Sequence, residues 1–274
     1  MSKANSLKEG RKRYHADLVS SHVAPPSEPA MPSVAAIIRR VLNAVLPVEC
    51  ASCGRALADD PVPFFCQPCW ESIHPLSGPS CPRCGRPFAS TVALLYSPHH
   101  LCGACRLRRP AYTQAWSLYP YEPPLQDAIR LFKYHGKVAL ADALGSLMSA
   151  AVPHPLEVDL LMPVPLHPSR LKEREFNQSL LLADHLNRRL RLPLSYGNLI
   201  RVRRTEPQTA LTRKARLKNL RRAFVVLRPE EVAGKKILLV DDVATTGTTV
   251  NECAKALRKA GAADVYVGTL ARTI

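Results

Sequence analysis

Apolar and polar residues follow one another along this chain in the pattern of an α/β protein. Residues 237–240, Ile-Leu-Leu-Val, form an uninterrupted apolar run, which is typical of a strand buried on both faces of a parallel sheet. Similar patterns predict further strands at 112–121, 158–164, 199–202 and 223–227, and helices at 123–134, 138–151, 179–189 and 250–260. We therefore expect a mostly parallel sheet with helices on both faces.

The residues before position 48 differ from the rest of the chain. Residues 1–32 are rich in Ser, Pro and basic side chains, which predicts a disordered extension. Residues 33–47 place apolar side chains at helical spacing, with Arg39 and Arg40 on the other side, which predicts an amphipathic helix. We expect this helix to pack on the adjoining domains, and a membrane-surface role is the alternative. A cysteine-rich segment at 48–108 and a larger domain at 109–274 complete the predicted organisation.

Eight of the nine cysteines form four C-x2-C pairs. Thiolates two residues apart can reach one tetrahedral ion, and two such pairs complete a closed structural zinc site. A disulfide framework is the rival interpretation, but we see no apolar secretory segment, and redox chemistry needs a single pair near a βαβ unit. The spacing therefore predicts two structural zinc ions. The favoured groups are Cys50, Cys53, Cys66 and Cys69 for one ion and Cys81, Cys84, Cys102 and Cys105 for the other, with an interleaved arrangement left open.

The net charge of the chain indicates what kind of partner it binds. The 274 residues carry a formal net charge of +16, which indicates a polyanionic partner, although charge speaks to association and not to fold. No apolar run is long enough to span a membrane. We expect a cytoplasmic protein.

Two acids and a threonine-rich loop follow the 237–240 run directly. Carboxylates such as Asp241 and Asp242 can accept hydrogen bonds from the two hydroxyls of a ribose. Hydroxyls and N–H groups at a helix N-terminus bind phosphate. The loop residues concerned are Ala244, Thr245, Thr246, Gly247, Thr248 and Thr249. The segment predicts a ribose 5-phosphate site with both acids at the strand end, outside the core, and a plain βα turn with solvent-facing acids is the alternative.

This segment resembles the motif of type I phosphoribosyltransferases that binds 5-phosphoribosyl pyrophosphate (PRPP). The whole arrangement resembles the ComF family (competence protein F-like, also GntX-like), which joins a double zinc ribbon to such a domain. The stretches that carry this resemblance are the four cysteine pairs, LFKYHG, PVPLHPSR, FNQS, RTEPQTALTRKARLKN and VDDVATTGTTV. The resemblance implies a small double zinc ribbon before a sheet of the type I phosphoribosyltransferase kind, with Asp241 and Asp242 as the catalytic acids that hold the ribose.

A second site segment follows the strand predicted at 158–164. Its composition predicts a basic loop. In the resembled family the loop at this place receives the pyrophosphate, often beside a strained peptide. The resemblance puts that peptide at residues 165–169 here. A solvated basic loop is the alternative. Where the family pattern has glycine, this chain has Glu175, which is strained if the position needs positive φ. The candidates for pyrophosphate are Pro165, Arg170, Arg174 and Lys133.

Residues 201–222 carry nine Lys or Arg and one acid. In type I phosphoribosyltransferases this location holds a flexible loop that closes over PRPP, where cations can assist the departing pyrophosphate. The same cations can neutralise nucleic-acid phosphates, and a plain charged surface loop is the remaining alternative. The residues concerned are Arg213, Lys214, Arg216 and Lys218.

Two functions from different classes fit these features. In the first, which the resemblance implies, the protein binds PRPP and single-stranded DNA and acts in DNA uptake or processing during natural transformation. In the second it is an active phosphoribosyltransferase of nucleotide salvage, in which an unidentified acceptor attacks C1 of PRPP as magnesium-bound pyrophosphate leaves. The zinc module can also dock DNA-uptake or recombination proteins, which is compatible with the first function.

Overall fold

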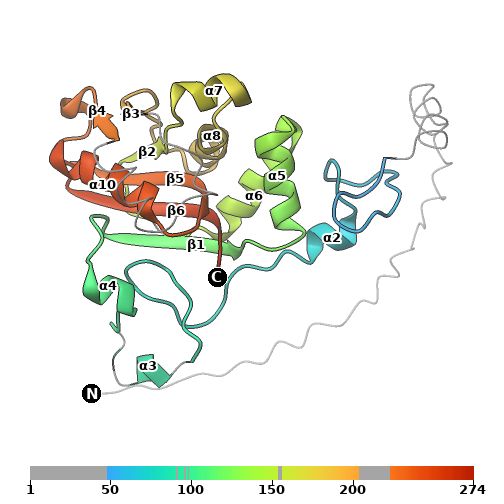
Figure 1. Ribbon diagram of the computed structural model, residues 1–274, viewed down its shortest axis with the longest axis horizontal. Helices are drawn as coiled ribbons and strands as arrows, with labels where there is room; N and C mark the ends of the chain where they lie inside the picture. Colours follow the sequence, from blue (N-terminus) through green and yellow to red (C-terminus); the bar gives the residue numbers. More distant parts are fainter. Residues whose placement is uncertain (1–47, 91, 96, 98, 154–155, 204–222) are drawn as a thin grey trace, which may run out of the picture.

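The computed structural model describes residues 48–90, 92–95, 97, 99–153, 156–203 and 223–274. Its centre is a four-stranded parallel sheet in the order β1-β6-β5-β2, and β3 and β4 form a separate antiparallel pair (Figure 1). The prediction of a mostly parallel sheet is confirmed. The strands are β1 (Gln114–Pro120), β2 (Leu160–Pro163), β3 (Leu199–Arg201), β4 (Phe224–Val226), β5 (Lys236–Ala244) and β6 (Asp264–Arg272).

Helices cover both faces of the sheet because the central strand β5 is apolar on both faces. Leu238 and Val240 lie in one core cluster with side chains of α5, α6 and α8, whereas Ile237 and Leu239 lie in the other with side chains of α10. The helices are α2 (Gln67–Glu71), α3 (Val92–Leu95), α4 (Gly103–Leu107), α5 (Leu125–Tyr134), α6 (Ala141–Ala151), α7 (Pro168–Arg174), α8 (Gln178–Leu190) and α10 (Thr248–Lys259), with 3₁₀ helices η1 (Val138–Leu140) and η3 (Pro229–Glu231).

Strand β5 continues through the two acids to Ala244, further than its apolar run. The neighbouring strand β6 is the reason, because its backbone pairs Asp241 with Thr269 and Ala244 with Arg272. Asp242 is 7% exposed in this position. The expectation that both acids lie outside the core is therefore wrong for Asp242.

A helix replaces the basic loop that the sequence analysis expected after β2. Helix α7 begins at Pro168, whose fixed φ suits the first turn. The His167 Nδ1 atom accepts a hydrogen bond from Ser169 N, and Glu175 ends the helix in a left-handed conformation. These local caps explain why a Pro- and Arg-rich stretch is helical here.

The two cysteine-rich ribbons contact different parts of the sheet domain. The first ribbon carries Cys50, Cys53, Cys66 and Cys69, and the second carries Cys81, Cys84, Cys102 and Cys105. The first ribbon lies beside α5 and α6, where Lys137 Nζ stands 5.0 Å over the Phe64 ring. The second lies beside β1 (Figure 1), and its cysteines belong to the same core cluster as side chains of α10. There Ala115 N donates to Arg83 O at 3.0 Å, and an added Cβ on Gly85 (φ 65°) would stand 2.6 Å from Ala115 O. This close approach requires glycine.

Short segments hydrogen-bond to the two outer strands of the sheet. At β1, Leu76 N donates to Leu118 O at 2.8 Å. At β2, Leu161 N donates to Pro193 O at 2.8 Å, and Ser195 N donates to Leu161 O at 3.0 Å. Each outer strand therefore has a backbone partner on its far side.

Several predicted features lie outside the described residues. They are the extension at 1–32, the amphipathic helix at 33–47, and the basic residues Arg213, Lys214, Arg216 and Lys218. Among the helices that the structure does describe, none has the length and apolar character needed to cross a membrane.

Candidate functional site

The acid pair of β5 lies at the carboxyl end of the parallel strands, which is where open α/β sheets bind ligands. Ser179, in the first turn of α8, donates its hydroxyl to Asp241 Oδ1 at 3.0 Å. The backbone N–H of Asp242 donates to the same oxygen at 3.0 Å. Both bonds converge on one carboxylate oxygen, which fixes the orientation of Asp241.

Lys133, in the last turn of α5, completes the acid pair. Its Nζ atom lies 2.8 Å from Asp242 Oδ1, and the two side chains are 14% and 10% exposed. Burial acts to lower the pKa of Lys133, but the charges of Asp242 and Asp241 outweigh it and the pKa is raised. The amine therefore stays protonated and offsets one of the two carboxylate charges.

Asp241 has the most perturbed carboxyl group of the site. Withdrawal from water and the neighbouring charge of Asp242 raise the pKa of Asp241 to about 7, against the opposing effect of Lys133. Burial also lowers the pKa of the Arg201 guanidinium, while the charge of Asp241 acts in the opposite direction. Arg201 also lines the cavity between α7, α8 and β3, so it is a candidate site residue that the sequence analysis did not identify.

The loop after β5 turns into α10 at Gly247, whose φ of 70° favours glycine. The hydroxyl oxygens of Thr246 and Thr248 lie 2.8 Å apart, and Thr248 is buried as the first residue of the helix. The first N–H groups of an α-helix have no acceptor within the helix, and its dipole favours an anion there. The structure therefore places hydroxyls and N–H donors of the predicted phosphate loop at a helix N-terminus.

The basic candidates of α7 divide into two kinds. Arg170 pairs with Glu173 of the same helix at 3.0 Å, so its charge is directed along the surface of α7. Arg174 instead lies with its guanidinium 5.0 Å over the ring of Tyr134 and donates to Gln178 Oε1 at 3.1 Å. Because Tyr134 ends α5, this stack brings Arg174 to the helix that carries Lys133.

Two donors beside this stack have no hydrogen-bond acceptor within the described residues. They are Arg174 Nε and Gln178 Nε2, and Gln178 is only 1% exposed. A buried donor without a partner costs about 1–3 kcal/mol. An acceptor from a ligand would remove that cost, and the end of α8 at which Gln178 lies favours an anionic one.

Glu175 occupies a backbone conformation that favours glycine. Its φ is 66°, and the other non-glycine residues with positive φ in the described ranges are Phe64 and Arg191. The cis peptide within the same ranges is Pro123–Pro124. Residues 165–169 have neither a cis peptide nor a positive φ, so the strained peptide expected there is not seen. The strained residue of this region is Glu175, six residues further on, at the position where the resembled family has glycine.

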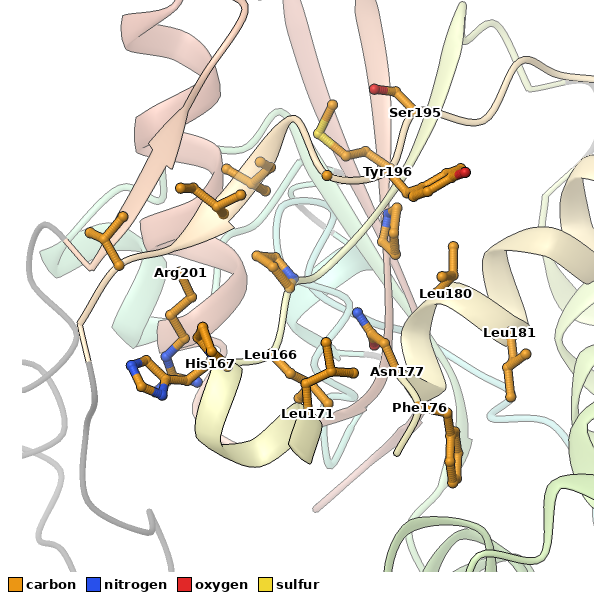
Figure 2. A pocket seen from close by; sticks show the side chains of 18 of the residues that line it. Leu166, His167, Leu171, Phe176, Asn177, Leu180, Leu181, Ser195, Tyr196 and Arg201 are labelled. Atoms are coloured by element: carbon orange, nitrogen blue, oxygen red, sulfur yellow. The ribbon is translucent and has the colours of Figure 1, made fainter. Parts of the chain in front are cut away.

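A cavity of about 780 Å³ opens between α7, α8 and β3. Its wall is mainly apolar, and Figure 2 shows Leu166 and Tyr196 on it together with the polar side chains of Asn177 and Arg201. Pro165, a candidate for pyrophosphate, also lines this cavity, whereas the acid pair does not. The volume lies in the range of small-molecule sites.

The eight paired cysteines lie in the two groups of four that their spacing favoured, and the sulfurs within each group are all within 4.8 Å of one another. The Cys53 and Cys66 sulfurs are 3.6 Å apart, and those of Cys84 and Cys102 are 3.7 Å apart. A tetrahedral zinc ion with Zn–S bonds of about 2.3 Å separates its sulfurs by about 3.8 Å, whereas a disulfide needs about 2.05 Å. The donor set therefore fits structural zinc and not disulfides. Cys253 is buried in α10 and belongs to neither group.

Ser179 is a second site residue that the sequence analysis did not assign. It belongs to the quoted FNQS stretch, where Asn177 caps α8 by accepting from Ser179 N at 3.0 Å. The signal that could have found it is the polar run at the start of a predicted helix that faces the acid pair. For Arg201 the signal was a single charge within an otherwise apolar strand.

Two protein families match this chain. The double zinc ribbon domain family matches residues 41–108, and the phosphoribosyl transferase domain family matches residues 177–273. Among solved structures, similar folds include an orotate phosphoribosyltransferase from Aeropyrum pernix, at 18% identity over 51% of this chain and 75% of that one, with a TM-score of 0.32.

Curated relatives match most of the chain. The competence protein F of Haemophilus influenzae is 34% identical over 76% of this chain and 90% of its own length. The DNA utilization protein YhgH of Escherichia coli is 35% identical over 71% of this chain and 84% of its own length. The competence protein ComFC of Bacillus subtilis is 31% identical over 76% of this chain and 84% of its own length.

Proposed function

This chain belongs to the ComF family of competence and DNA utilization proteins, and from that membership we propose that it binds PRPP and single-stranded DNA and acts in DNA uptake or use. The observation that carries the PRPP part is the arrangement at the carboxyl end of β5. The acids Asp241 and Asp242, the threonine-rich loop and the buried Lys133 all meet there.

The described side chains have distinct proposed roles toward PRPP. Asp241 and Asp242 accept hydrogen bonds from the ribose hydroxyls, and the loop 245–249 takes the 5-phosphate. Lys133 and Arg174 would bind the pyrophosphate, and Mg²⁺ entering with PRPP would neutralise part of its charge. In this arrangement Asp242 exchanges its bond with Lys133 for a ribose hydroxyl, which frees the amine for the pyrophosphate.

The DNA part of the proposal is supported by family membership and by charge. The net charge of +16 favours a polyanion, and the basic segment 201–222 is long enough to contact several phosphates. Seven of its nine basic residues, those at 204–222, lie outside the described part of the chain, so their role comes from the sequence alone. Neutralising phosphates releases bound counterions, which makes such binding weaker as salt rises.

Fluorescence anisotropy of a labelled single-stranded oligonucleotide tests this proposal. Zinc-loaded protein is titrated across a salt series, with and without PRPP and Mg²⁺. We expect salt-dependent binding that PRPP changes, and replacement of Arg213, Lys214, Arg216 and Lys218 by Ala should flatten the salt slope by about 0.7 per lost contact. Absence of oligonucleotide binding at physiological salt would overturn the proposal that the protein binds DNA. A calorimetric titration with PRPP then tests PRPP binding by itself.

One observation favours the alternative of an active phosphoribosyltransferase. The 780 Å³ cavity beside the site has the size and apolar wall of a pocket for a small heterocyclic acceptor, with Asn177 and Arg201 as polar groups for its edge. Release of pyrophosphate from PRPP in the presence of candidate bases tests this alternative. Acceptor-dependent release that Tyr196→Ala abolishes would favour it over a purely binding role.

A further inference from the structure

A second, smaller cavity lies where the second zinc ribbon meets the phosphate loop. Its volume is about 100 Å³. Thr246, Gly247 and Thr248 line it from the loop side. From the ribbon side and the neighbouring strand β6 it is lined by four arginines, namely Arg86, Arg108, Arg109 and Arg272, and no Asp or Glu lines it.

The zinc site next to this cavity does not account for all four arginines. Four thiolates and one Zn²⁺ carry a net charge of −2, so a bound zinc ion leaves an excess of about two positive charges at the cavity. Arg272 is 5% exposed and donates to Cys84 O at 2.6 Å, while its Nε atom has no acceptor among the described residues. An anion bound in the cavity would give this buried N–H an acceptor.

The other three arginines are available for the same anion. Arg86, Arg108 and Arg109 are exposed on the ribbon, and none of them forms an ion pair with another residue of the described ranges. All three line the same cavity as Thr246 and Thr248 at the start of α10. Guanidinium groups and a helix N-terminus are the groups that bind phosphate most often in proteins.

We propose that the second zinc ribbon and the phosphate loop together form one composite phosphate-binding site, with a phosphate ester group as its ligand. The cavity is small, about 100 Å³, and its arginines and hydroxyls suit a phosphate group. The ester is either the 5-phosphate of PRPP or a backbone phosphate of single-stranded DNA. That identity rests on the proposed function, whereas the site itself rests on the geometry.

The internal repeat of the two ribbons provides a matched control for the test. Arg86 follows Gly85 in the second ribbon as Arg55 follows Gly54 in the first, and Arg106 lies two residues from Arg108 without lining the cavity. The test variant is Arg86→Ala with Arg108→Ala, and the control is Arg55→Ala with Arg106→Ala. Both remove two charges from the ribbons, and zinc content is measured in each to show that the ribbons remain intact.

Inorganic phosphate is the first probe, added to the full-length zinc-loaded protein at constant ionic strength while Tm is recorded. A ligand of the folded state raises Tm with its concentration. We expect the wild type and the control to respond alike, and the test variant to bind phosphate on the order of tenfold more weakly. An equal response of all three proteins overturns the composite site.

Two further titrations identify the ester and separate this inference from the proposed function. If the test variant alone loses PRPP affinity by calorimetry, the site holds the 5-phosphate. If it alone loses oligonucleotide affinity by anisotropy, the site holds a backbone phosphate. A phosphate response specific to the intact site, in a wild type that binds neither PRPP nor DNA, would keep the site and overturn the proposed function. If the wild type binds PRPP and the test and control variants bind phosphate, PRPP and oligonucleotide equally well, the composite site is overturned and the PRPP part of the proposed function is kept.

Discussion

Lys133 Nζ lies 2.8 Å from Asp242 Oδ1 at a point where both side chains are almost fully withdrawn from water. The pair joins the end of α5 to the end of β5, so it is both a structural contact and part of the candidate site. A charge buried with its partner is tolerated, but the same charge alone is not. Substitutions at the acid pair should therefore change stability as well as ligand binding.

Asp242→Asn should lower the free energy of unfolding by about 3 kcal/mol, because it leaves the Lys133 ammonium buried without its counter-charge. Urea unfolding of the variant and the wild type measures this change. The double variant Lys133→Met with Asp242→Asn removes both charges and should regain much of the loss. Equal stability of Asp242→Asn and the wild type would show that the pair contributes nothing.

Asp241 should make the protein less stable as pH rises from about 4 to about 7. Its pKa is raised from 3.8 to about 7 in the fold, so in this window the folded chain holds a proton that the unfolded chain has lost. Asp241→Asn should remove this dependence and be more stable than the wild type at pH 8, by at most about 4 kcal/mol. Unfolding free energies measured at several pH values check this, and parallel profiles for the two proteins would contradict it.

Cys50→Ser should reduce bound zinc from two ions to one per chain and unfold the first ribbon, since structural zinc contributes folding energy directly. Metal analysis of the purified protein measures the content. Cys253→Ser is the matched control, because this buried cysteine lies outside both groups and should leave two ions bound. Two ions in Cys50→Ser would show that the first group is not a zinc site.

Glu175→Gly should raise the free energy of unfolding by about 1 kcal/mol, because glycine adopts φ of 66° without strain. Arg191→Gly is the control, since Arg191 ends α8 at φ of 54° in the same way but does not line the large cavity. The two variants should gain similar stability in urea unfolding. Only Glu175→Gly should also strengthen PRPP binding, because it removes a carboxylate from the pyrophosphate side. Tighter binding in both variants would point to a general effect of stability.

Gly85→Ala should destabilise the docking of the second ribbon more than Gly54→Ala destabilises the first. Both glycines have positive φ, which costs alanine about 1 kcal/mol. Only at Gly85 does the added methyl group also stand 2.6 Å from a backbone oxygen, that of Ala115, whereas Gly54 has open space. Limited proteolysis should therefore cut the second ribbon of Gly85→Ala faster, and equal rates for the two variants would contradict the docking contact.

The sequence predicts best what depends on local spacing. The 237–240 run marks the central strand because only apolar residues are stable between two helical layers, and C-x2-C spacing marks both cysteine groups because ligand reach is local. The end of β5 is not local, since Asp241 is held in the strand by its pairing with Thr269 of β6. For this reason the burial of Asp242 was not predicted.

The sequence alone also does not show which side chains from distant segments meet in the candidate site. Ser179 meets Asp241 from 62 residues away, and their hydrogen bond depends on how α8 lies across the sheet. The helix over Pro168–Arg174 was missed for a different reason, because its caps at His167 and Glu175 are unusual residues for their positions. Sequence patterns identify the strand ends and loops of the site, and the packing of the fold determines which side chains meet there.

The bond from Leu76 N to Leu118 O also bears on how this protein behaves without bound zinc. The segment that carries Leu76 lies between the two cysteine groups, which would anchor it on either side when zinc is bound. Chelation would release this segment and also the second ribbon, whose Arg83 O accepts from Ala115 N. Strand β1 would then be a bare edge, which is a template for pairing with strands of other molecules. Zinc in this family member would then act against self-association, and demetallated protein should aggregate before its central sheet unfolds.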